Sequence, residues 1–240
     1  MSQALPKATI TRREDITLDL WKIWLRPETT FKFKPGQYCT IGYNGIERAY
    51  SIVSSPYEEQ IELFIELVPL PYGNLTPLLY ELGVGGQVTF RPRAKGIFTL
   101  DERYSHHLMV STVTGVVPYV SILRSYLHDL RSGHKFYVLQ GASYADEFTY
   151  DKELQEMVQV HPDFIAYVPT VSRPREERNH GWKGEAGRVN TLLEKYVERF
   201  GLHREDTLVY ACGHPGMIED VKVRGAALDF PVQEERFWKD

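Results

Sequence analysis

The chain has 240 residues, 42% of them hydrophobic and 25% charged, which is enough apolar material to bury a sizeable core. Its formal net charge of -4 argues against general nucleic-acid binding, for which a basic stripe is expected. No apolar run approaches the roughly 18 to 20 residues of a membrane helix, and the N-terminus lacks the apolar core of a signal peptide. We therefore expect a cytoplasmic protein without membrane insertion.

The charge is unevenly distributed along the chain. Residues 1–100 carry 11 basic and 10 acidic side chains, whereas residues 101–240 carry 17 basic and 22 acidic ones. The first part contains a local group of basic residues that either meets an acidic partner or is a solvated surface. Its members are Lys32, Lys34, Arg91, Arg93 and Lys95.

Several kinds of site are disfavoured. The two cysteines, Cys39 and Cys212, lie far apart and lack C-x-x-C spacing, which argues against a disulfide framework or a protein-held iron-sulfur cluster. The eight histidines show no ligand spacing, and neither G-x-S-x-G nor a P-loop occurs, so neither a metal site nor a hydrolase is expected. Any redox chemistry must therefore use a bound cofactor.

Short strands separated by turns are predicted for residues 1–100. The segments 8–27, 36–44 and 61–68 alternate polar and apolar residues or are rich in β-formers, and "PYGN", "GVGG" and "RPRAKG" supply turns. This pattern is typical of a small antiparallel β-barrel or sandwich.

The pattern changes near Leu100–Asp101 to alternating strands and helices, which predicts a doubly wound parallel sheet in residues 101–240. The expected strands lie near residues 107–112, 135–142, 163–171 and 207–211. The expected helices lie near residues 118–131, 149–160, 189–200 and 215–228. One face of the first of these helices is predicted to be core; it contains Tyr119, Ile122, Leu123, Tyr126, Leu127 and Leu130.

Three segments have the pattern of binding sites. In "GIERAYSIVSSP", Arg48 and Tyr50 should point to one face of a strand and Ser51 to the other face or to an edge, although alone this is also an ordinary strand. Residues 73–82 begin with a Gly-x-x-Thr turn that opens a helix, an anion-binding geometry. Residues 109–127 resemble a strand, a tight turn and a helix with Pro118 in its first turn, but the turn contains a single glycine, Gly115.

Taken together, these segments resemble the ferredoxin-NADP reductase family, specifically its bacterial members. The shared motifs follow in the order Pro35-Gly36-Gln37, Arg48-x-Tyr50-Ser51, Gly73-x-x-Thr76, Thr112 to Pro118, Ser172-Arg173, Cys212-Gly213-x-Pro215 and a C-terminal aromatic residue. The resemblance covers essentially the whole chain. It implies an FAD-binding β-barrel domain, residues 1–100, followed by an α/β NADP(H)-binding domain, residues 101–240.

The resemblance also implies residue roles in the first domain. Arg48 would pair with an FAD phosphate, Tyr50 would lie against the isoalloxazine, and Ser51 would hydrogen-bond near flavin N5. Ala49 lies within the same motif. The FAD pyrophosphate would be covered by the turn of Gly73, Asn74, Leu75 and Thr76.

In the second domain the resemblance places the 2'-phosphate of NADP(H) at Ser172 and Arg173, with Arg188 as a second basic contact. Ser143 stands where close bacterial relatives often have another arginine. The loop with Thr112, Thr114 and Gly115 would contact the nucleotide, while Val113 and Val117 replace the glycines of such relatives. We expect this substitution to weaken nucleotide binding.

Cys212 would lie beside the nicotinamide C4 without forming a covalent bond. The turn that follows it would contact the nucleotide through Gly213, His214, Pro215 and Met217. Phe237 and Trp238 are the terminal aromatic residues, and Trp238 is the residue expected to cover the flavin. Ser51, Cys212 and Trp238 are thus the predicted catalytic set.

The function implied by the resemblance is hydride transfer from NADPH to FAD and single-electron delivery to ferredoxin or flavodoxin by a monomeric enzyme. Two alternatives remain open. One is an NAD(P)H:flavin reductase or an electron-transfer subunit of an oxygenase or dehydrogenase system. The other is a non-catalytic nucleotide-binding docking module.

Overall fold

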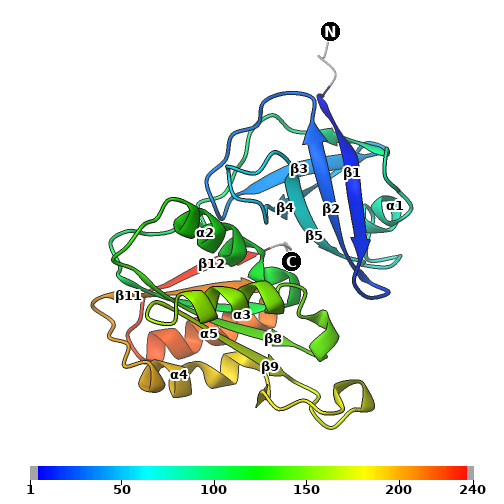
Figure 1. Cartoon of the computed structure of the whole chain (residues 1–240). Coiled ribbons are helices and arrows are strands. Elements are labelled where there is room, and N and C mark those ends of the chain that lie inside the picture. Colours follow the sequence, from blue (N-terminus) through cyan, green and yellow to red (C-terminus); the bar gives the residue numbers. More distant parts are fainter. Residues whose placement is uncertain (1–4, 237–240) are drawn as a thin grey trace. The chain divides into compact units, whose positions relative to one another are not determined.

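The computed structural model describes residues 5–236 and divides the chain into two compact units (Figure 1). The first unit contains Met1–Leu100 together with Val120–Leu130, and the second contains Asp101–Tyr119 together with Arg131–Asp240. Leu100 ends the first segment of the first unit, and most of one helix, Val120–Leu130, is also grouped with that unit.

The first unit is built on a six-stranded antiparallel sheet with the order β4-β3-β6-β1-β2-β5. Beyond the end of β4, the Val53 amide donates to the Glu62 carbonyl of β5 at 3.0 Å, so the two edges of the sheet approach each other as in a barrel. The elements are β1 (Lys7–Asp15), β2 (Leu20–Pro27), β3 (Tyr38–Tyr43), β4 (Ile46–Ser51), β5 (Ile61–Glu66), α1 (Thr76–Tyr80) and β6 (Gln87–Phe90).

Alternation along the strands builds the core of this unit. In β2, Trp21, Ile23 and Leu25 are fully buried, while Trp24 between them is half-buried beneath the guanidinium of Arg12 at 4.2 Å. Burying each such apolar side chain contributes about 1.5–3 kcal/mol to folding. The period of two therefore fixes which face of β2 lies inward.

A two-residue turn sets the register of the hairpin β3–β4. Asn44 and Gly45 both have positive φ, 50° and 81°, as a type I′ turn requires. The resulting register places Ser51 opposite Tyr38. The turn thus determines where the side chains of the Arg48-Tyr50-Ser51 motif lie on β4.

The second unit is a six-stranded, all-parallel sheet with the order β10-β9-β8-β7-β11-β12. Its strands are β7 (His106–Thr112), β8 (Lys135–Ala142), β9 (Ile165–Val171), β10 (Glu185–Ala186), β11 (Thr207–Gly213) and β12 (Val232–Arg236). Its α-helices are α3 (Asp151–Val160), α4 (Leu193–Arg199) and α5 (Pro215–Ala227), and short 3-10 turns are η1 (Val113–Val116), η2 (Ala145–Glu147), η3 (Glu177–Asn179) and η4 (Val189–Leu192).

Helices cover both faces of this sheet. Residues of α4 and α5 share one hydrophobic cluster with Leu108, Val110 and Val209 of the strands. Figure 1 shows α3 on the opposite side of the sheet from α4 and α5. The strand order reverses between β7 and β11, and the carboxyl ends of the strands at such a point are where ligands bind in open α/β sheets. The predicted fold class is confirmed.

Helix α2 (Val117–His128) follows the turn η1. Its predicted apolar face is buried at Tyr119, Ile122, Leu123 and Tyr126, and Leu127 is half-buried. The prediction was wrong for Leu130, which is 89% exposed, because the helix ends at His128 and Leu130 adopts a left-handed φ of 52°.

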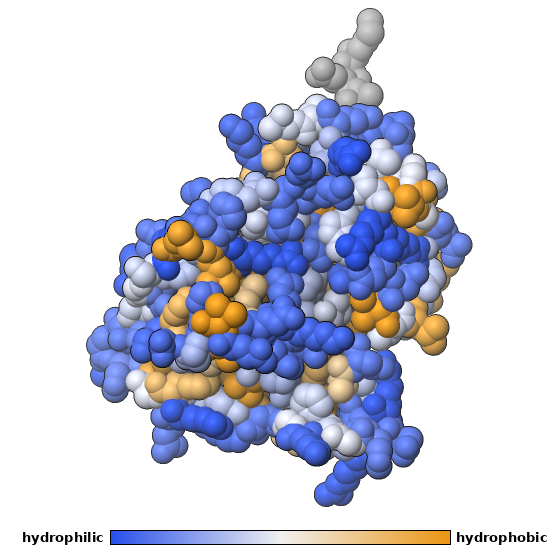
Figure 2. Space-filling model, in the orientation of Figure 1, coloured by the Kyte–Doolittle hydropathy of each residue, from blue (hydrophilic) through white to orange (hydrophobic). Residues whose placement is uncertain are grey.

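The surface is mostly hydrophilic on the face that Figure 2 shows, with apolar residues in separate small groups. Within residues 5–236, no helix combines the length and apolar character needed to cross a membrane. Both cysteines are free and buried.

Candidate functional site

The motif on β4 presents three different environments. Arg48 and Ala49 are exposed, and Arg48 Nη1 donates to the Glu47 carbonyl at 2.7 Å. Tyr50 packs against the core of the first unit, and burial raises the pKa of its phenol. Ser51 is 6% exposed. The motif thus offers an exposed cation, the flat face of a phenol and a buried hydroxyl within four residues.

The hydroxyl of Ser51 has no hydrogen-bond partner among residues 5–236. Leaving a buried polar atom unpaired costs about 1–3 kcal/mol, and such atoms call for an explanation in each case. A bound group with a polar atom at this position would remove the cost. The Ser51 hydroxyl therefore fits a ligand site on β4.

The turn before α1 differs in detail from the prediction. Thr76 Oγ1 donates to the Val68 carbonyl at 3.1 Å and accepts from the Val68 amide at 3.0 Å, so its single proton is already engaged. Leu75 is 2% exposed and belongs to the core. A Cβ on Gly73 would lie 1.8 Å from the Val68 carbonyl oxygen, so only glycine fits there.

What remains available to an anion at this turn is the backbone. Among the described residues, the amides of Asn74, Leu75 and Thr76 donate no hydrogen bond, and Asn74 is exposed. Three consecutive free N–H groups suit a phosphate. The hydroxyl of Thr76 instead shapes the turn that presents them.

The loop after β7 and the end of β11 approach each other closely at two glycines. A Cβ on Gly115 would lie 2.1 Å from the Cys212 carbonyl oxygen, and one on Gly213, where φ is +128°, would lie 2.3 Å from Thr112 Oγ1. The His214 amide donates to Thr112 Oγ1 at 2.8 Å. The absence of a side chain at Gly115 and Gly213 thus allows the two strand ends to approach closely, and the hydrogen bond to the Thr112 hydroxyl links them.

The loop itself contains a strained residue. Val113 has a φ of 41°, a left-handed conformation that is an outlier for a β-branched side chain. Its side chain packs against the cluster of Ala142, Phe148 and Val171. Thr114 is half-buried, and its carbonyl accepts from the amide of Val117. Val113 therefore adopts a backbone conformation that glycine would adopt without strain.

The residues after β11 open helix α5. His214 is the exposed N-cap, with its Nδ1 accepting from the Gly216 amide at 3.1 Å, and Pro215 occupies the first turn. Met217 was predicted to contact the nucleotide, but it is 5% exposed and lies in the hydrophobic core of the second unit. Its helical position turns it toward the sheet.

Cys212 is fully buried near the end of β11, opposite Glu235 of β12 in the sheet register. Burial, with a smaller contribution from Glu235, raises the pKa of the thiol, so it is uncharged. Burial also raises the pKa of Glu235 to about 7. Sequence reasoning missed Glu235; its signal was a carboxylate two residues before the terminal aromatic pair. Phe237 and Trp238 lie outside the described residues.

The predicted phosphate-contact residues follow β9. Ser172 is exposed, and its amide donates to the Ala142 carbonyl at 2.9 Å. Arg173 Nη1 donates to the Tyr144 hydroxyl at 2.8 Å. Arg188 is exposed at the N-cap of η4, and its guanidinium has no partner in the described part of the chain. Arg188 is therefore an unneutralised cation.

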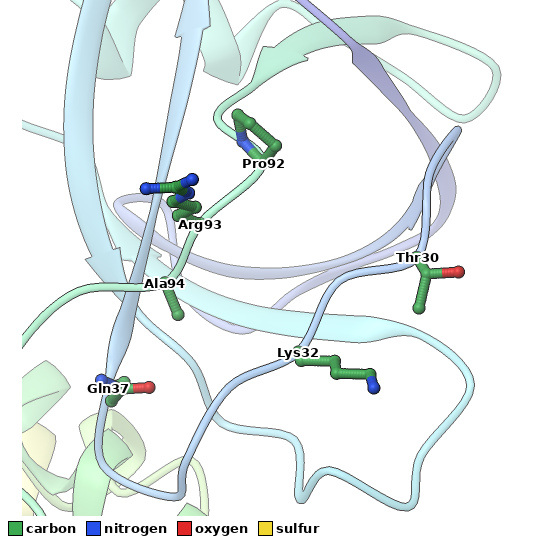
Figure 3. Close-up of a pocket in the computed structure, with 6 residues that line it drawn as sticks. All are labelled: Thr30, Lys32, Gln37, Pro92, Arg93 and Ala94. Atoms are coloured by element: carbon green, nitrogen blue, oxygen red, sulfur yellow. The ribbon is translucent and has the colours of Figure 1, made fainter.

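An open cavity of about 490 Å³ lies in the first unit (Figure 3). Figure 3 shows Lys32 on one side of it and Arg93 on the other, with Gln37 below. Neither Lys32 nor Arg93 has an ion-pair partner among the residues described. Its full lining is Thr30, Lys32, Gln37, Pro92, Arg93 and Ala94.

The chain is similar to known proteins over most of its length. A family model described as oxidoreductase NAD-binding domain matches residues 109–223. The flavodoxin/ferredoxin-NADP reductase of Escherichia coli (strain K12) is 30% identical over 200 residues, which cover 79% of this chain and 77% of that protein. NADH-cytochrome b5 reductase 1 of Candida glabrata is 28% identical over 204 residues, which cover 82% of this chain and 68% of that protein.

The fold also matches a solved structure. A ferredoxin NADP+ reductase from Neisseria gonorrhoeae, crystallised with bound FAD and NADP, superposes with a TM-score of 0.83 at 22% identity, covering 98% of this chain and 100% of that one. The resemblance found in the motifs is thus confirmed over most of the sequence. The chain belongs to the ferredoxin-NADP reductase family and is an oxidoreductase.

Proposed function

We propose that this enzyme binds FAD in residues 1–100 and NADP(H) in residues 101–240, takes a hydride from NADPH, and passes single electrons to ferredoxin or flavodoxin in the cytoplasm as a monomer. The observation that carries the proposal is the buried, unpaired hydroxyl of Ser51 within the Arg48-Tyr50-Ser51 motif. Family membership supports the same function.

For FAD, the residues of the first unit supply the contacts. Arg48 would pair with a phosphate, the face of Tyr50 would support the ring system, and the free amides of residues 74–76 would bind the pyrophosphate. When bound, FAD accepts a hydride and releases electrons one at a time. The protein's contribution is to position the reacting groups and exclude water.

For NADP(H), the second unit offers the carboxyl ends of β7 and β11. The hydroxyl of Thr114, the first turn of α5 and the cations Arg173 and Arg188 are the proposed contacts. Thr112 holds the loop through its bond to the His214 amide. We expect the strained Val113 to limit how closely the backbone approaches a phosphate.

The buried thiol of Cys212 and the half-buried carboxyl of Glu235 would line the reacting end. The thiol of Cys212 is uncharged, so it serves as a compact wall and forms no covalent bond. Glu235, with a pKa of about 7, holds its proton below neutral pH and can exchange it near neutral pH. Trp238 is the proposed flavin-covering residue, with Phe237 as the alternative.

The acceptor is proposed to dock on the basic surface around the cavity of Figure 3. Lys32 and Arg93 line this cavity (Figure 3), and Lys34 and Lys95 are exposed close to them in sequence, whereas Arg91 pairs with Glu47 at 2.6 Å. Such a surface would attract an acidic electron acceptor and speed its encounter with the enzyme. Lys32→Gln and Arg93→Gln should each slow acceptor reduction at low salt, whereas Lys152→Gln, which removes the same single charge from an exposed site elsewhere, should not.

A different acceptor within the same class of enzyme is the second candidate function. The similarity to an NADH-cytochrome b5 reductase favours it, since that protein is named for another donor and acceptor. An NAD(P)H:flavin reductase or an electron-transfer subunit would use the same two sites. A panel of acceptors offered to the reduced enzyme separates these possibilities.

Ser51→Ala tests the proposal directly. Because the hydroxyl is unpaired in the protein, its removal should leave the FAD-free protein equally stable or about 1–3 kcal/mol more stable. The same change should slow reduction of the FAD-loaded enzyme by NADPH. If Ser51→Ala destabilises the FAD-free protein and leaves reduction unchanged, Ser51 is structural and the proposal loses its main support.

A further inference from the structure

Tyr144 is approached by two arginines in the loops that follow β8 and β9. Arg173 Nη1 donates to its hydroxyl at 2.8 Å, and the guanidinium carbon of Arg178 lies 4.2 Å from the centroid of its ring. Arg173 belongs to a recognised motif, whereas Arg178 belongs to none. Two guanidinium groups thus converge on one half-buried phenol.

Each of these arginines already pairs with a carboxylate. Arg178 Nε donates to Asp146 Oδ2 at 2.8 Å, and Arg173 Nη1 lies 3.7 Å from Glu176 Oε1. The Tyr144 hydroxyl also donates to Glu176. The charges of these two arginines and two carboxylates balance, and the nearby Glu147 carboxylate also acts on both arginines, so the net attraction for a dianion is small.

Asn179 holds this arrangement in place. Its side chain is 2% exposed; Oδ1 accepts from the Ala145 amide at 2.9 Å, and Nδ2 donates to the carbonyls of Ser143 and Arg173 at 2.9 Å each. The two loops are thus tied together by one buried amide. The side chains of Glu176 and Asp146 are 52% and 51% exposed, so they can rotate into solvent without moving the backbone.

We propose that Arg178 joins Arg173 in binding the 2'-phosphate of NADP(H), and that Glu176 and Asp146 compete with this phosphate and thereby lower the selectivity for NADP(H) over NAD(H). A phosphate presents three acceptor oxygens, which can replace both carboxylates at the guanidinium groups. The inference rests on the proposed function, because it assigns the residues that set its nucleotide preference.

The test is the calorimetric affinity for 2',5'-ADP and for 5'-AMP, which differ only in the 2'-phosphate. Glu176→Gln should tighten binding of 2',5'-ADP about two- to fivefold at low salt, since exposed charge pairs have effects of this size, and leave 5'-AMP binding unchanged. The gain should shrink as salt is added. Arg178→Gln should weaken 2',5'-ADP binding by a similar factor, again without affecting 5'-AMP.

Glu177→Gln is the matched control. It makes the same charge change in the same loop, but Glu177 forms no ion pair or side-chain hydrogen bond within residues 5–236. Equal effects of Glu176→Gln and Glu177→Gln would show that only net charge matters, and unchanged 2',5'-ADP binding in Arg178→Gln would remove Arg178 from the site. Either result overturns the inference while the proposed function stands. A wild-type protein that binds neither fragment refutes the proposed nucleotide site and the inference with it.

Discussion

Replacing His107 by leucine should remove a pH dependence of stability that arises within the second unit. His107 lies on β7, is fully buried, and its ring is 5.2 Å from the ring of Phe136 and 5.4 Å from that of His134. Neither ring nitrogen has a hydrogen-bond partner by distance and angle in the described part of the chain. The imidazole is therefore held in an apolar environment in its neutral form.

Burial lowers the pKa of His107 to about 3. The neighbouring His134 and His106 act in the same direction, whereas Asp101 and a weak interaction with the Tyr104 backbone oppose it without restoring the ordinary value. Charging this ring in place would therefore cost free energy that the unfolded chain does not pay.

The direction in which stability changes with pH follows from the pKa values of His107 in the unfolded and folded states. The unfolded chain takes up a proton near the ordinary value of 6.5, and the folded protein takes it up only near 3, so the unfolded state binds more protons between these limits. Stability therefore falls as the pH drops through 6.5 and stops falling below 3. Between pH 7 and pH 5 the loss from His107 is about 2 kcal/mol.

Urea unfolding followed by circular dichroism at pH 7 and pH 5 measures this effect. The stability difference between wild type and His107→Leu should change by about 2 kcal/mol between the two pH values, because contributions of all other groups cancel. His106→Gln is the control, since the side chain of His106 is 22% exposed on the same strand. Parallel pH dependences for wild type and His107→Leu would show that His107 is solvated or charged in the folded protein.

Three further predictions concern other residues. Glu235→Gln should have the opposite effect to His107→Leu, because the pKa of Glu235 in the folded protein, about 7, exceeds the ordinary 4.5. The stabilisation by Glu235 is therefore present below pH 4.5 and is lost as the pH rises through 7. Wild type should gain about 2 kcal/mol of stability from Glu235 between pH 7 and pH 5, and urea unfolding of the variant should lack this gain. Val113→Gly should change thermal stability by less than about 1 kcal/mol, because relief of a left-handed φ, about 1–2 kcal/mol, offsets the lost packing of the side chain. Val116 is buried, and Val116→Gly should cost more than twice the stability that Val113→Gly costs. Equal losses in the two variants would contradict strain at Val113. Thr76→Val should destabilise FAD-free protein by about 1–3 kcal/mol in urea unfolding, whereas Thr76→Ser should not; a loss of FAD affinity alone would mean that the hydroxyl contacts the cofactor.

The sequence predicted the architecture well because apolar periodicity sets it. The buried strands β7, β8, β9 and β11 and the apolar face of α2 follow directly from that periodicity. The edge strand β12 did not, since its residues are largely charged and only half-buried, and pairing with β11 rather than composition places it in the sheet. Glu235 was missed for the same reason.

Individual side-chain roles were harder to predict than positions in the fold. Met217 stands in a motif but faces inward, as its spacing to Ile218 and Val221 on α5 indicates. Thr76 bonds to Val68, eight residues away, which no local pattern reveals. Asn179 joins two loops through contacts 34 and 36 residues apart in sequence, so only the folded structure identifies it.

Anaerobic stopped-flow reduction of the FAD-loaded protein is the most direct test of the proposed function. Loss of the visible flavin absorbance band should follow mixing with NADPH, in a rapid phase whose rate saturates with nucleotide concentration, and NADH should give weaker binding, with a preference that Arg173→Gln reduces. A protein that cannot be loaded with FAD, or one whose bound FAD is not reduced by either nucleotide, would contradict the account.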